Sequence, residues 1–455
     1  MSEVALATTD LHRKYGKLPH FRLTNGFIEE DKTNGVNGTA WLQRPGLSSP
    51  QTIGSSGTIR LMWRQKGAFS GSFAVITGAS FYRLEESGTQ TLIGSIPGTD
   101  YPVVAGGIDK IIIVSEGVAY YATSSTFSTI TMPAGELVST VIYINGYFLL
   151  PVLNTQKVFW IAPGGTNPNA LDYFSCERVS DNIITGFAQG DTVWFLKQTN
   201  EEVWVPTGTA AAPFQRVTGR FSTYGCIARN SACACGPANA WVSIDAEIVV
   251  ADGTPQVVSS PSDSEALRTA TNLRSWYFSL DGHRFYILTT DIATFVVDLS
   301  TGSVARYNSF GFDYWRAHLG AVSDRLILAG DSNSNTVWTV DPEASNDNGQ
   351  VVTREVTGFV GNVGDPVSCD SISLNVDAGW SPSPTFEPTL QMRFSDDQGN
   401  TWSSWKAKGL GLQGYYGKDV TFRSLGSVVR PGRLFQFRMT DNARFRLSYA
   451  RMNEV

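Results

Sequence analysis

The fold is decided by residues 191–207, which read DTVWFLKQTNEEVWVPT. Two short runs of branched and aromatic residues flank a polar turn, the pattern of a β-hairpin. Similar units recur outward in both directions, with large anchor residues 38 to 47 positions apart. A period of about 40 residues with about four short strands is typical of a β-propeller blade, so we predict about seven blades. The anchors are Tyr82, Tyr120, Trp160, Trp204, Ile248, Phe295 and Trp338.

The chain has 455 residues, enough for two or three domains. Its Gly- and Asn-rich beginning has little periodicity, whereas its end contains several alternating apolar runs typical of a sandwich. We therefore expect an all-β protein in which a β-propeller is followed by a C-terminal β-sandwich. The predicted segments are an irregular N-terminal arm (1–56), the propeller (57–343), a polar linker (344–350) and the sandwich (351–455).

One helix is expected within the propeller, over residues 262–273. Ser262 and Glu265 have the spacing of a capping box, and good helix formers follow them. Because this segment lies between two predicted blades, we expect the helix to decorate one face of the wheel.

The net charge of −6 is unevenly distributed. Residues 391–455 contain eleven Lys and Arg against five Asp and Glu, which gives this segment +6 and leaves −12 on the other 390 residues. No apolar run reaches the length of a membrane helix, and the N-terminus lacks the order of a secretory signal. We therefore expect a soluble protein, made in a cytoplasm, with one basic end.

The five cysteines are an odd set for a disulfide framework, and the histidines lie far from them in sequence. Cys233 and Cys235 can point to one strand face, but buried structural thiols are favoured over a zinc site. A nucleophile elbow, a metal-binding trio and a phosphate loop are all absent from the sequence. We therefore predict a protein that is not an enzyme and has no cofactor or metal.

The segment Ser395-Asp396-Asp397-Gln398-Gly399-Asn400-Thr401-Trp402 matches the Asp-box pattern S-x-D-x-G-x-T-W. In such a hairpin the carboxylate accepts local hydrogen bonds, the glycine permits a positive φ and the tryptophan packs beneath. The box occurs in sialidases, but it is a folding motif that lies away from their chemistry. We interpret it as structural, with Ser395, Asp397, Gly399, Thr401 and Trp402 as its members.

The last predicted hairpin concentrates positive charge. A three-residue turn at 441–443 would pair Arg438 with Arg446 and place the apolar residues on the opposite face. Like charges across a strand pair are unfavourable without an acidic partner. Two readings remain open: a solvated face relieved by nearby acids, or a docking surface for another chain or for DNA phosphate. The candidate docking residues are Arg433, Arg438, Arg444, Arg446 and Arg451.

Residues 172–306 resemble the packaged-DNA stabilisation proteins of short-tailed bacteriophages, also called tail hub or nozzle proteins. The resemblance is carried by the hairpin around Trp194 and Trp204, the Tyr224-Gly225 turn, and the Gly253 hairpin that continues into Gln256-Val257. Arg44-Pro45-Gly46 and the stretch 422–452 also fit.

The resemblance implies a structural virion protein of the tail, assembled in the host cytoplasm. Its expected partners are further copies in a ring, implied to be hexameric, the adaptor below the portal, tail spikes or fibres, and a tail needle. Genomic DNA would pass through the lumen without sequence-specific contacts, and no membrane insertion is expected.

Two other functions compete with this interpretation. The Asp box and twelve tryptophans suit a carbohydrate-binding or sialidase-like propeller, which would require an arginine cluster and paired acids on one propeller face. A cellular scaffold resembling WD-repeat proteins is disfavoured, because the Gly-His and Trp-Asp punctuation of those repeats is absent.

Overall fold

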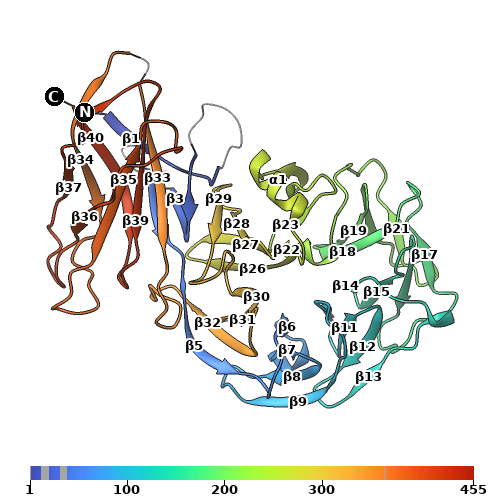
Figure 1. Ribbon diagram of the computed structural model, residues 1–455. Coiled ribbons are helices and arrows are strands. Elements are labelled where there is room, and N and C mark those ends of the chain that lie inside the picture. The colour runs from blue at the N-terminus through green and yellow to red at the C-terminus, as the bar shows by residue number, and fades with distance from the viewer. Residues whose placement is uncertain (1, 12–19, 31–37, 363, 455) are drawn as a thin grey trace.

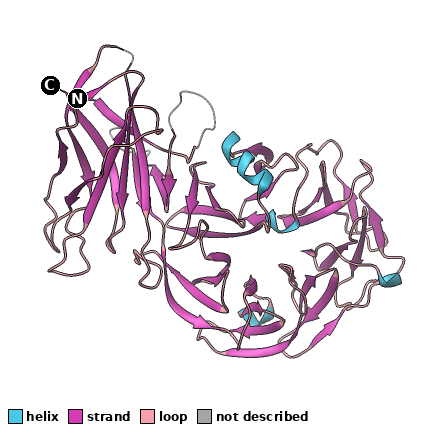
Figure 2. Cartoon of the chain, viewed as in Figure 1, coloured by secondary structure: helices cyan, strands magenta, loops and turns pink. Residues whose placement is uncertain are grey.

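Antiparallel strands make up most of the computed structural model, which describes residues 2–11, 20–30, 38–362 and 364–454. Figure 1 shows a wheel of short sheets with a sandwich attached to one side. Helices are confined to short segments (Figure 2). The prediction of an all-β protein with a propeller followed by a sandwich is confirmed.

Five blades are separate four-stranded meanders of consecutive strands. They are β6–β9 (Ile59–Trp63, Phe73–Thr77, Ser80–Leu84, Gln90–Ser95), β10–β13 (Val103–Gly106, Ile111–Ser115, Val118–Ala122, Phe127–Thr129), β14–β17 (Ile142–Ile144, Tyr147–Pro151, Lys157–Ile161, Tyr173–Ser175), β18–β21 (Ile183–Gln189, Thr192–Lys197, Glu201–Pro206, Phe214–Arg216) and β22–β25 (Cys233–Cys235, Ala238–Val242, Ile248–Asp252, Thr254–Val257).

A sixth blade closes the wheel with a strand from the beginning of the chain. Strands β30 (Ala317–Val322), β31 (Ile327–Asp331) and β32 (Thr336–Asp341) are completed by β5 (Gly46–Thr52), which pairs antiparallel with β32. Because β5 covers the free edge of β32, the two ends of the propeller segment are joined by a backbone ladder.

A further four-stranded meander, β26–β29 (Arg274–Leu280, His283–Thr289, Thr294–Asp298, Val304–Tyr307), occupies the remaining place in the wheel. We call it the junction meander, because β29 pairs with β2 (Leu23–Thr24) and β2 pairs with β33 (Arg354–Gly361) of the sandwich. The expectation of about seven equivalent blades is therefore corrected. Six blades are separate sheets, and the junction meander is part of a 16-stranded sheet that continues into the sandwich.

The anchor residues read from the sequence occupy one equivalent position in the wheel. Each lies in the third strand of its four-stranded unit, from Tyr82 in β8 to Trp338 in β32. A repeated apolar strand in this position packs one sheet against its neighbour. All of the anchors except the partly buried Tyr82 are buried, and full burial of a large apolar side chain contributes about 1.5–3 kcal/mol relative to exposure.

The beginning of the chain is not an irregular arm in its described residues. Strands β1 (Ser2–Leu6), β3 (Gly26–Glu30) and β4 (Thr39–Gln43) belong to the sandwich. β2 pairs with strands of both domains, and β5 belongs to a blade. β1 pairs with β40 (Arg446–Glu454) through its first residues and with β33 through Ala5 and Leu6. A single strand thus connects the two sheets of the sandwich.

One sandwich sheet contains β33, β35 (Thr389–Ser395), β36 (Lys406–Gly409) and β39 (Gly432–Met439). The other contains β3, β4, β34 (Val367–Val376), β37 (Val420–Arg423) and β40, with β38 (Ser427–Val428) at the edge of β34. One apolar core includes Trp276 and Trp315 from the wheel as well as Phe445 and Leu447 from the sandwich. The two domains therefore share buried surface as well as backbone hydrogen bonds.

The one α-helix in the described part of the chain, α1, spans Pro261–Thr269 and begins one residue earlier than the sequence suggested. Its N-cap is Ser260, which forms the capping box with Asp263 rather than Ser262 with Glu265. Pro261, the first residue of the helix, explains the shift, because proline is favoured in the first helical turn. No helix among the described residues has the length and apolar character needed to cross a bilayer.

Candidate functional site

The last two strands do not form the predicted hairpin. β39 pairs with β33 and β35, whereas β40 pairs with β34, β1 and β4, so the two strands belong to opposite sheets. Arg438 lies opposite Glu355, and Arg446 lies opposite Leu42. The predicted pairing of Arg438 with Arg446 is therefore wrong. Most of the apolar set is nevertheless buried in one core, because both strands alternate with period 2 and both sheets bury an inner face.

Arg433 is engaged inside the chain and is only 2% exposed. Its Nε and Nη2 donate to the carboxylate of Asp396 at 2.6 and 2.8 Å. Its Nη1 and Nη2 also donate to the backbone carbonyls of Leu425 and Ser427. This guanidinium stabilises the sandwich and leaves little for a docking partner.

Arg438 is half-buried between neighbouring side chains of its own sheet. Its Nε and Nη2 donate to Gln391 Oε1 at 2.9 and 2.7 Å, and its guanidinium carbon lies 4.0 Å from the centre of the Trp405 ring. The charge is thus held by an amide and an aromatic face, and Glu355 lies opposite it across the ladder.

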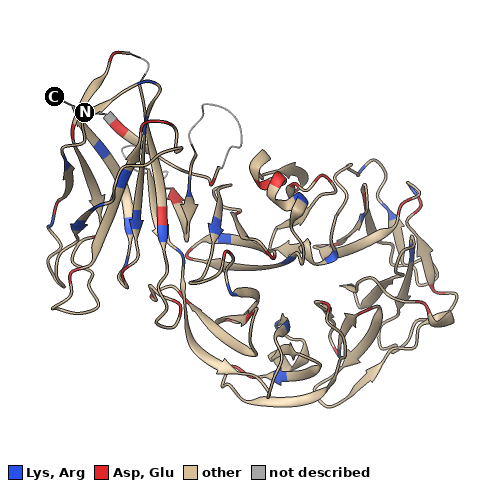
Figure 3. Ribbon diagram, in the orientation of Figure 1, with Lys and Arg blue, Asp and Glu red and all other residues tan. Residues whose placement is uncertain are grey.

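The remaining candidate arginines are more accessible but do not converge. Arg444 Nε lies 3.4 Å from Asp377 Oδ2, and its guanidinium faces the Trp380 ring at 5.2 Å. Arg446 Nη2 lies 3.9 Å from a carboxylate oxygen of Glu29 in β3, and β4 lies between β3 and β40. Arg451 covers the Tyr449 ring at 4.6 Å. Figure 3 shows Lys and Arg positions on several sandwich strands, with Asp and Glu positions among them.

The Asp box forms a tight hairpin between β35 and β36. Asp397 Oδ1 accepts from Ser395 Oγ at 2.7 Å and from the Thr401 N–H at 2.8 Å, and Oδ2 accepts from Thr401 Oγ1 at 2.6 Å. Desolvation opposes ionisation, but these hydrogen bonds outweigh it and lower the pKa of Asp397 to about 2. Gly399 adopts φ +101°, and Trp402 Nε1 donates to its carbonyl at 3.0 Å. The carboxylate is engaged within its own turn.

Four of the five cysteines are buried, and Cys233 is partly exposed. Burial raises the pKa of Cys226 to about 11 and that of Cys176 well above its usual value. These thiols therefore remain protonated and behave as small apolar groups. Within the described part of the chain, no group of three or more His, Cys, Asp or Glu side chains is arranged to hold a metal ion.

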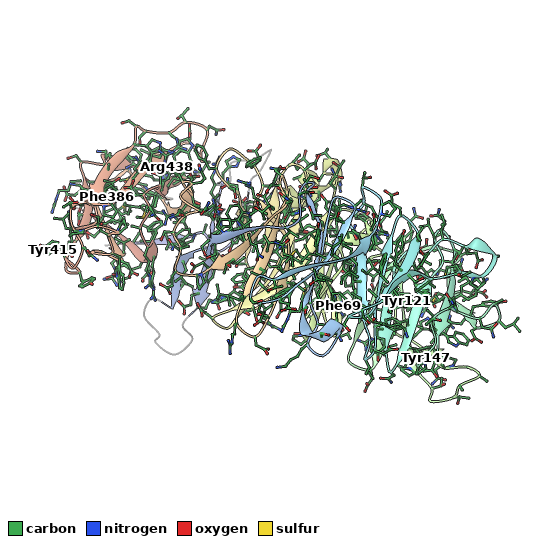
Figure 4. The ribbon with its side chains drawn as sticks, turned by 90° about the horizontal axis from the view of Figure 1, so that it is seen from below. Phe69, Tyr121, Tyr147, Phe386, Tyr415 and Arg438 are labelled. Carbon is green, nitrogen blue, oxygen red and sulfur yellow. The ribbon has the colours of Figure 1, made fainter. Side chains whose placement is uncertain are left out.

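An exposed aromatic patch, which was not predicted from the sequence, lies on two loops at the end of the sandwich. Trp380, Tyr415 and Tyr416 are 48%, 61% and 63% exposed, and the Trp380 and Tyr416 rings lie 5.8 Å apart. Figure 4 shows Phe386 and Tyr415 near the end of the molecule remote from the propeller. The signal available in the sequence was the Tyr415-Tyr416 pair inside a glycine-rich loop. We call Trp380, Phe386, Tyr415 and Tyr416 the sandwich-tip patch.

The backbone holds the two loops of the sandwich-tip patch together. The Gly379 N–H donates to the Leu410 carbonyl at 2.9 Å, and the Gly414 N–H donates to the Gly379 carbonyl at 3.0 Å. A Cβ at Gly379 would lie 2.7 Å from the backbone of Tyr415, so only glycine permits this approach. Pre-positioned, exposed aromatic side chains are typical of protein interfaces.

The propeller surrounds a cavity of ≈ 470 Å³ that we call the central channel. The first strand of each four-stranded unit lines it. One mouth is covered by the 3₁₀ turn η3 (Arg229–Ser231), whose Arg229 reaches across to Asp100 at 2.8 Å and to the carbonyls of Tyr101 and Ser139, each at 3.0 Å. Asp100 also accepts from Arg60 Nη2 at 3.0 Å. These contacts connect opposite sides of the wheel at this mouth of the channel.

A propeller and a sandwich that share one sheet, with a channel braced by Arg229 and Asp100, define a two-domain all-β protein whose domains are tied together. Two family models match the chain: bacteriophage P22 Gp10, beta-propeller, over residues 31–345, and bacteriophage P22 Gp10, beta-sandwich, over residues 354–454. The chain belongs to the bacteriophage P22 Gp10 family. The resemblance to phage packaged-DNA stabilisation and tail hub proteins is confirmed, and the chain is a structural, virion-associated phage tail component.

No curated protein matches the chain significantly. Similar solved structures include BBS1N in complex with ARL6DN (10% identity, TM-score 0.42, covering 67% of this chain and 99% of that one) and a chain of the Mitotic Checkpoint Complex (11%, 0.44, 65% and 92%). BamB from Moraxella catarrhalis is another (11%, 0.39, 74% and 96%).

Proposed function

We propose that this chain is a tail hub, or nozzle, protein that acts by assembly. Copies form a ring, a hexamer as the family resemblance implies, below the portal and adaptor. The ring extends the DNA channel, helps to retain packaged DNA and offers docking sites for tail spikes or fibres and for a needle. The observation that supports this most strongly is that the matches to P22 Gp10 span both domains.

The duplex passes between copies, not through a propeller. The central channel has a volume of ≈ 470 Å³, within the range of small-molecule pockets, and Arg229 and Asp100 brace one mouth. The lumen is therefore a space that several copies enclose. An excess of negative charge on that wall would repel phosphate and let DNA slide, consistent with the −12 on the first 390 residues.

Rigid coupling of the domains suits a ring subunit. β2 hydrogen-bonds to both domains, and Arg44 binds Asp347 through two contacts of 2.9 and 2.7 Å beneath the junction. A docking partner on the sandwich would therefore be held in a fixed position relative to the wheel. The sandwich-tip patch, with the exposed Arg444 beside it, is the docking surface we assign to a tail protein.

The experiment is reconstitution with particles that lack this chain but contain packaged DNA. We expect the added protein to bind the tail vertex as a ring and to reduce DNA loss, measured by electron microscopy and nuclease-sensitive DNA. Binding without any retention of DNA would contradict the stabilising role, and failure to bind the vertex would contradict the hub role.

A second candidate is binding or cleavage of host-surface glycans. The observation that favours it is the exposed Trp380–Tyr416 pair, since aromatic faces can stack on sugar rings. A glycan array and a fluorogenic sialoside assay test it. Turnover of the sialoside would replace the tail hub proposal with a sialidase-like activity.

A further inference from the structure

Positive charge is under-compensated at the braced mouth of the central channel. Arg60 and Arg229 share the single carboxylate of Asp100, with contacts of 3.0 and 2.8 Å. Arg274, at the start of β26, lines the same cavity and has no carboxylate within 4.0 Å among the described residues. Two guanidinium groups therefore share one acid, and a third lines the cavity without an ion pair to any described residue.

The surroundings of Arg274 hold it in place without neutralising it. The residue is 4% exposed; its Nε donates to His318 Nδ1 at 2.5 Å, and its Nη1 donates to the Asn272 carbonyl at 2.8 Å. The Tyr101 ring lies 5.2 Å from the guanidinium carbon. Nη2 makes no hydrogen bond to any described residue.

The neighbouring titratable groups that the structure describes form no ion pair with Arg274. Burial lowers the pKa of Arg274, and the interactions with Tyr101, Tyr314 and Asp291 offset this only in part. His318 accepts a hydrogen bond at Nδ1 and is therefore neutral, and burial together with Arg274 holds its pKa well below the usual range. Asp291 and Glu116 are exposed and accept from the backbone N–H groups of Thr271 and Thr99, respectively. They remain at the surface, outside the cavity.

Burying a cation without a counter-charge is costly, because its hydration is lost. A bound anion would offset this cost. The cavity has the volume of a small-ligand site, and its other lining residues apart from Arg229 are uncharged. Gln65, beyond the end of β6, lines the same cavity and is exposed, which gives a path of entry from the mouth opposite Arg274.

We propose that the central channel is a binding site for a small oxyanion, a phosphate or carboxylate group, that accepts hydrogen bonds from Arg274 Nη2. His318 and Asn272 fix the plane of the guanidinium, and the two N–H groups of Nη2 remain to donate to such a group. This site is independent of the tail assembly, and the proposal does not depend on ring formation.

The test is calorimetric titration of the full-length protein with inorganic phosphate, malonate and N-acetylneuraminic acid, each against sodium chloride of equal ionic strength. We expect saturable binding of at least one oxyanion and weakening by about tenfold or more in Arg274→Met, the effect of losing a charged hydrogen-bond donor. Arg325→Met, at an exposed arginine outside the cavity, is the matched control and should bind like the wild type. No saturable binding, or equal binding by Arg274→Met, would overturn the proposal.

A second measurement uses only the wild-type protein, in case Arg274→Met does not fold. Crystals soaked in selenate, a tetrahedral oxyanion with an anomalous signal, should show a peak within hydrogen-bonding distance of Arg274 Nη2. A peak only at surface arginines, or none, would contradict the proposal. Preference for N-acetylneuraminic acid or malonate over phosphate would assign the site to carboxylates, and the reverse would assign it to phosphates.

Discussion

Arg229 and Asp100 join opposite sides of the central channel through a 2.8 Å ion pair, although 129 residues separate them in sequence. Arg229 belongs to the turn before β22, and Asp100 precedes β10. Burial opposes ionisation of Asp100, but the Glu116 N–H, Ser115 and Arg229 outweigh it and lower the pKa of Asp100. The contact links non-adjacent blades, so it resists opening of the wheel more directly than contacts between neighbours.

Removing this carboxylate should destabilise the wheel. Asp100→Asn leaves two arginines without their acid, and we expect a loss of about 2–3 kcal/mol in the free energy of unfolding, measured in urea. Asp324→Asn is the control, because Asp324 pairs with Lys66 at the surface, and it should leave the unfolding midpoint unchanged. Equal unfolding midpoints for wild type and Asp100→Asn would show that the ion pair between Arg229 and Asp100 does not stabilise the protein.

The junction between the domains should depend on a second buried pair. Asp347→Asn leaves the fully buried Arg44 guanidinium without its acid, and we expect about 3–5 kcal/mol of destabilisation. Replacing both partners, as Arg44→Met with Asp347→Leu, should recover much of that loss, because no uncompensated charge remains. Calorimetry measures both. A double variant as unstable as Asp347→Asn alone would contradict the electrostatic explanation.

The free energy of unfolding should depend on pH through the titration of His283. The hydrogen bond from His283 to Asp298, 2.6 Å long, raises the pKa of His283 above its usual value and outweighs burial. The stabilisation is therefore complete below about pH 6.5, the pKa of an unperturbed histidine, and is lost as the pH rises through the raised folded-state pKa. The difference in unfolding free energy between wild type and His283→Gln should be larger at pH 5.5 than at pH 8.5. A difference that grows toward high pH would refute this assignment.

The sandwich-tip patch should be needed for assembly and dispensable for folding. Trp380→Ala with Tyr416→Ala removes exposed rings, so we expect an unchanged melting temperature and circular dichroism spectrum. Binding to tail vertices should fall by about tenfold or more, as for an interface hot spot. Leu171→Ala, an exposed apolar residue on the propeller, is the control. Normal binding by the double variant would remove the patch from the docking surface.

The sequence predicted those features that local patterns determine. The spacing of the anchors from Tyr82 to Trp338 located the third strand of every four-stranded unit, because each unit repeats the same local pattern of residues. Alternation also assigned Phe435, Phe437 and Leu447 to a buried face. Period-2 alternation reports which way a side chain points, whichever strand lies alongside.

Strand partners could not be predicted from the same patterns. Arg438 and Arg446 lie close in sequence, but their strands belong to opposite sheets, where each strand pairs with strands distant in sequence. The first 56 residues lack strong periodicity, and their strands are stabilised by distant partners such as β32 and β40. The brace from Arg229 to Asp100 likewise depends on closure of the whole wheel, which no local spacing encodes.

The most direct test of the central claim is a cryo-electron microscopy map of the chain bound at the tail vertex. The account predicts a ring of copies whose lumen, wide enough for duplex DNA, lies between subunits, with each central channel still closed by Arg229 and Asp100. A single copy at the vertex, or density for DNA running through a propeller, would contradict it.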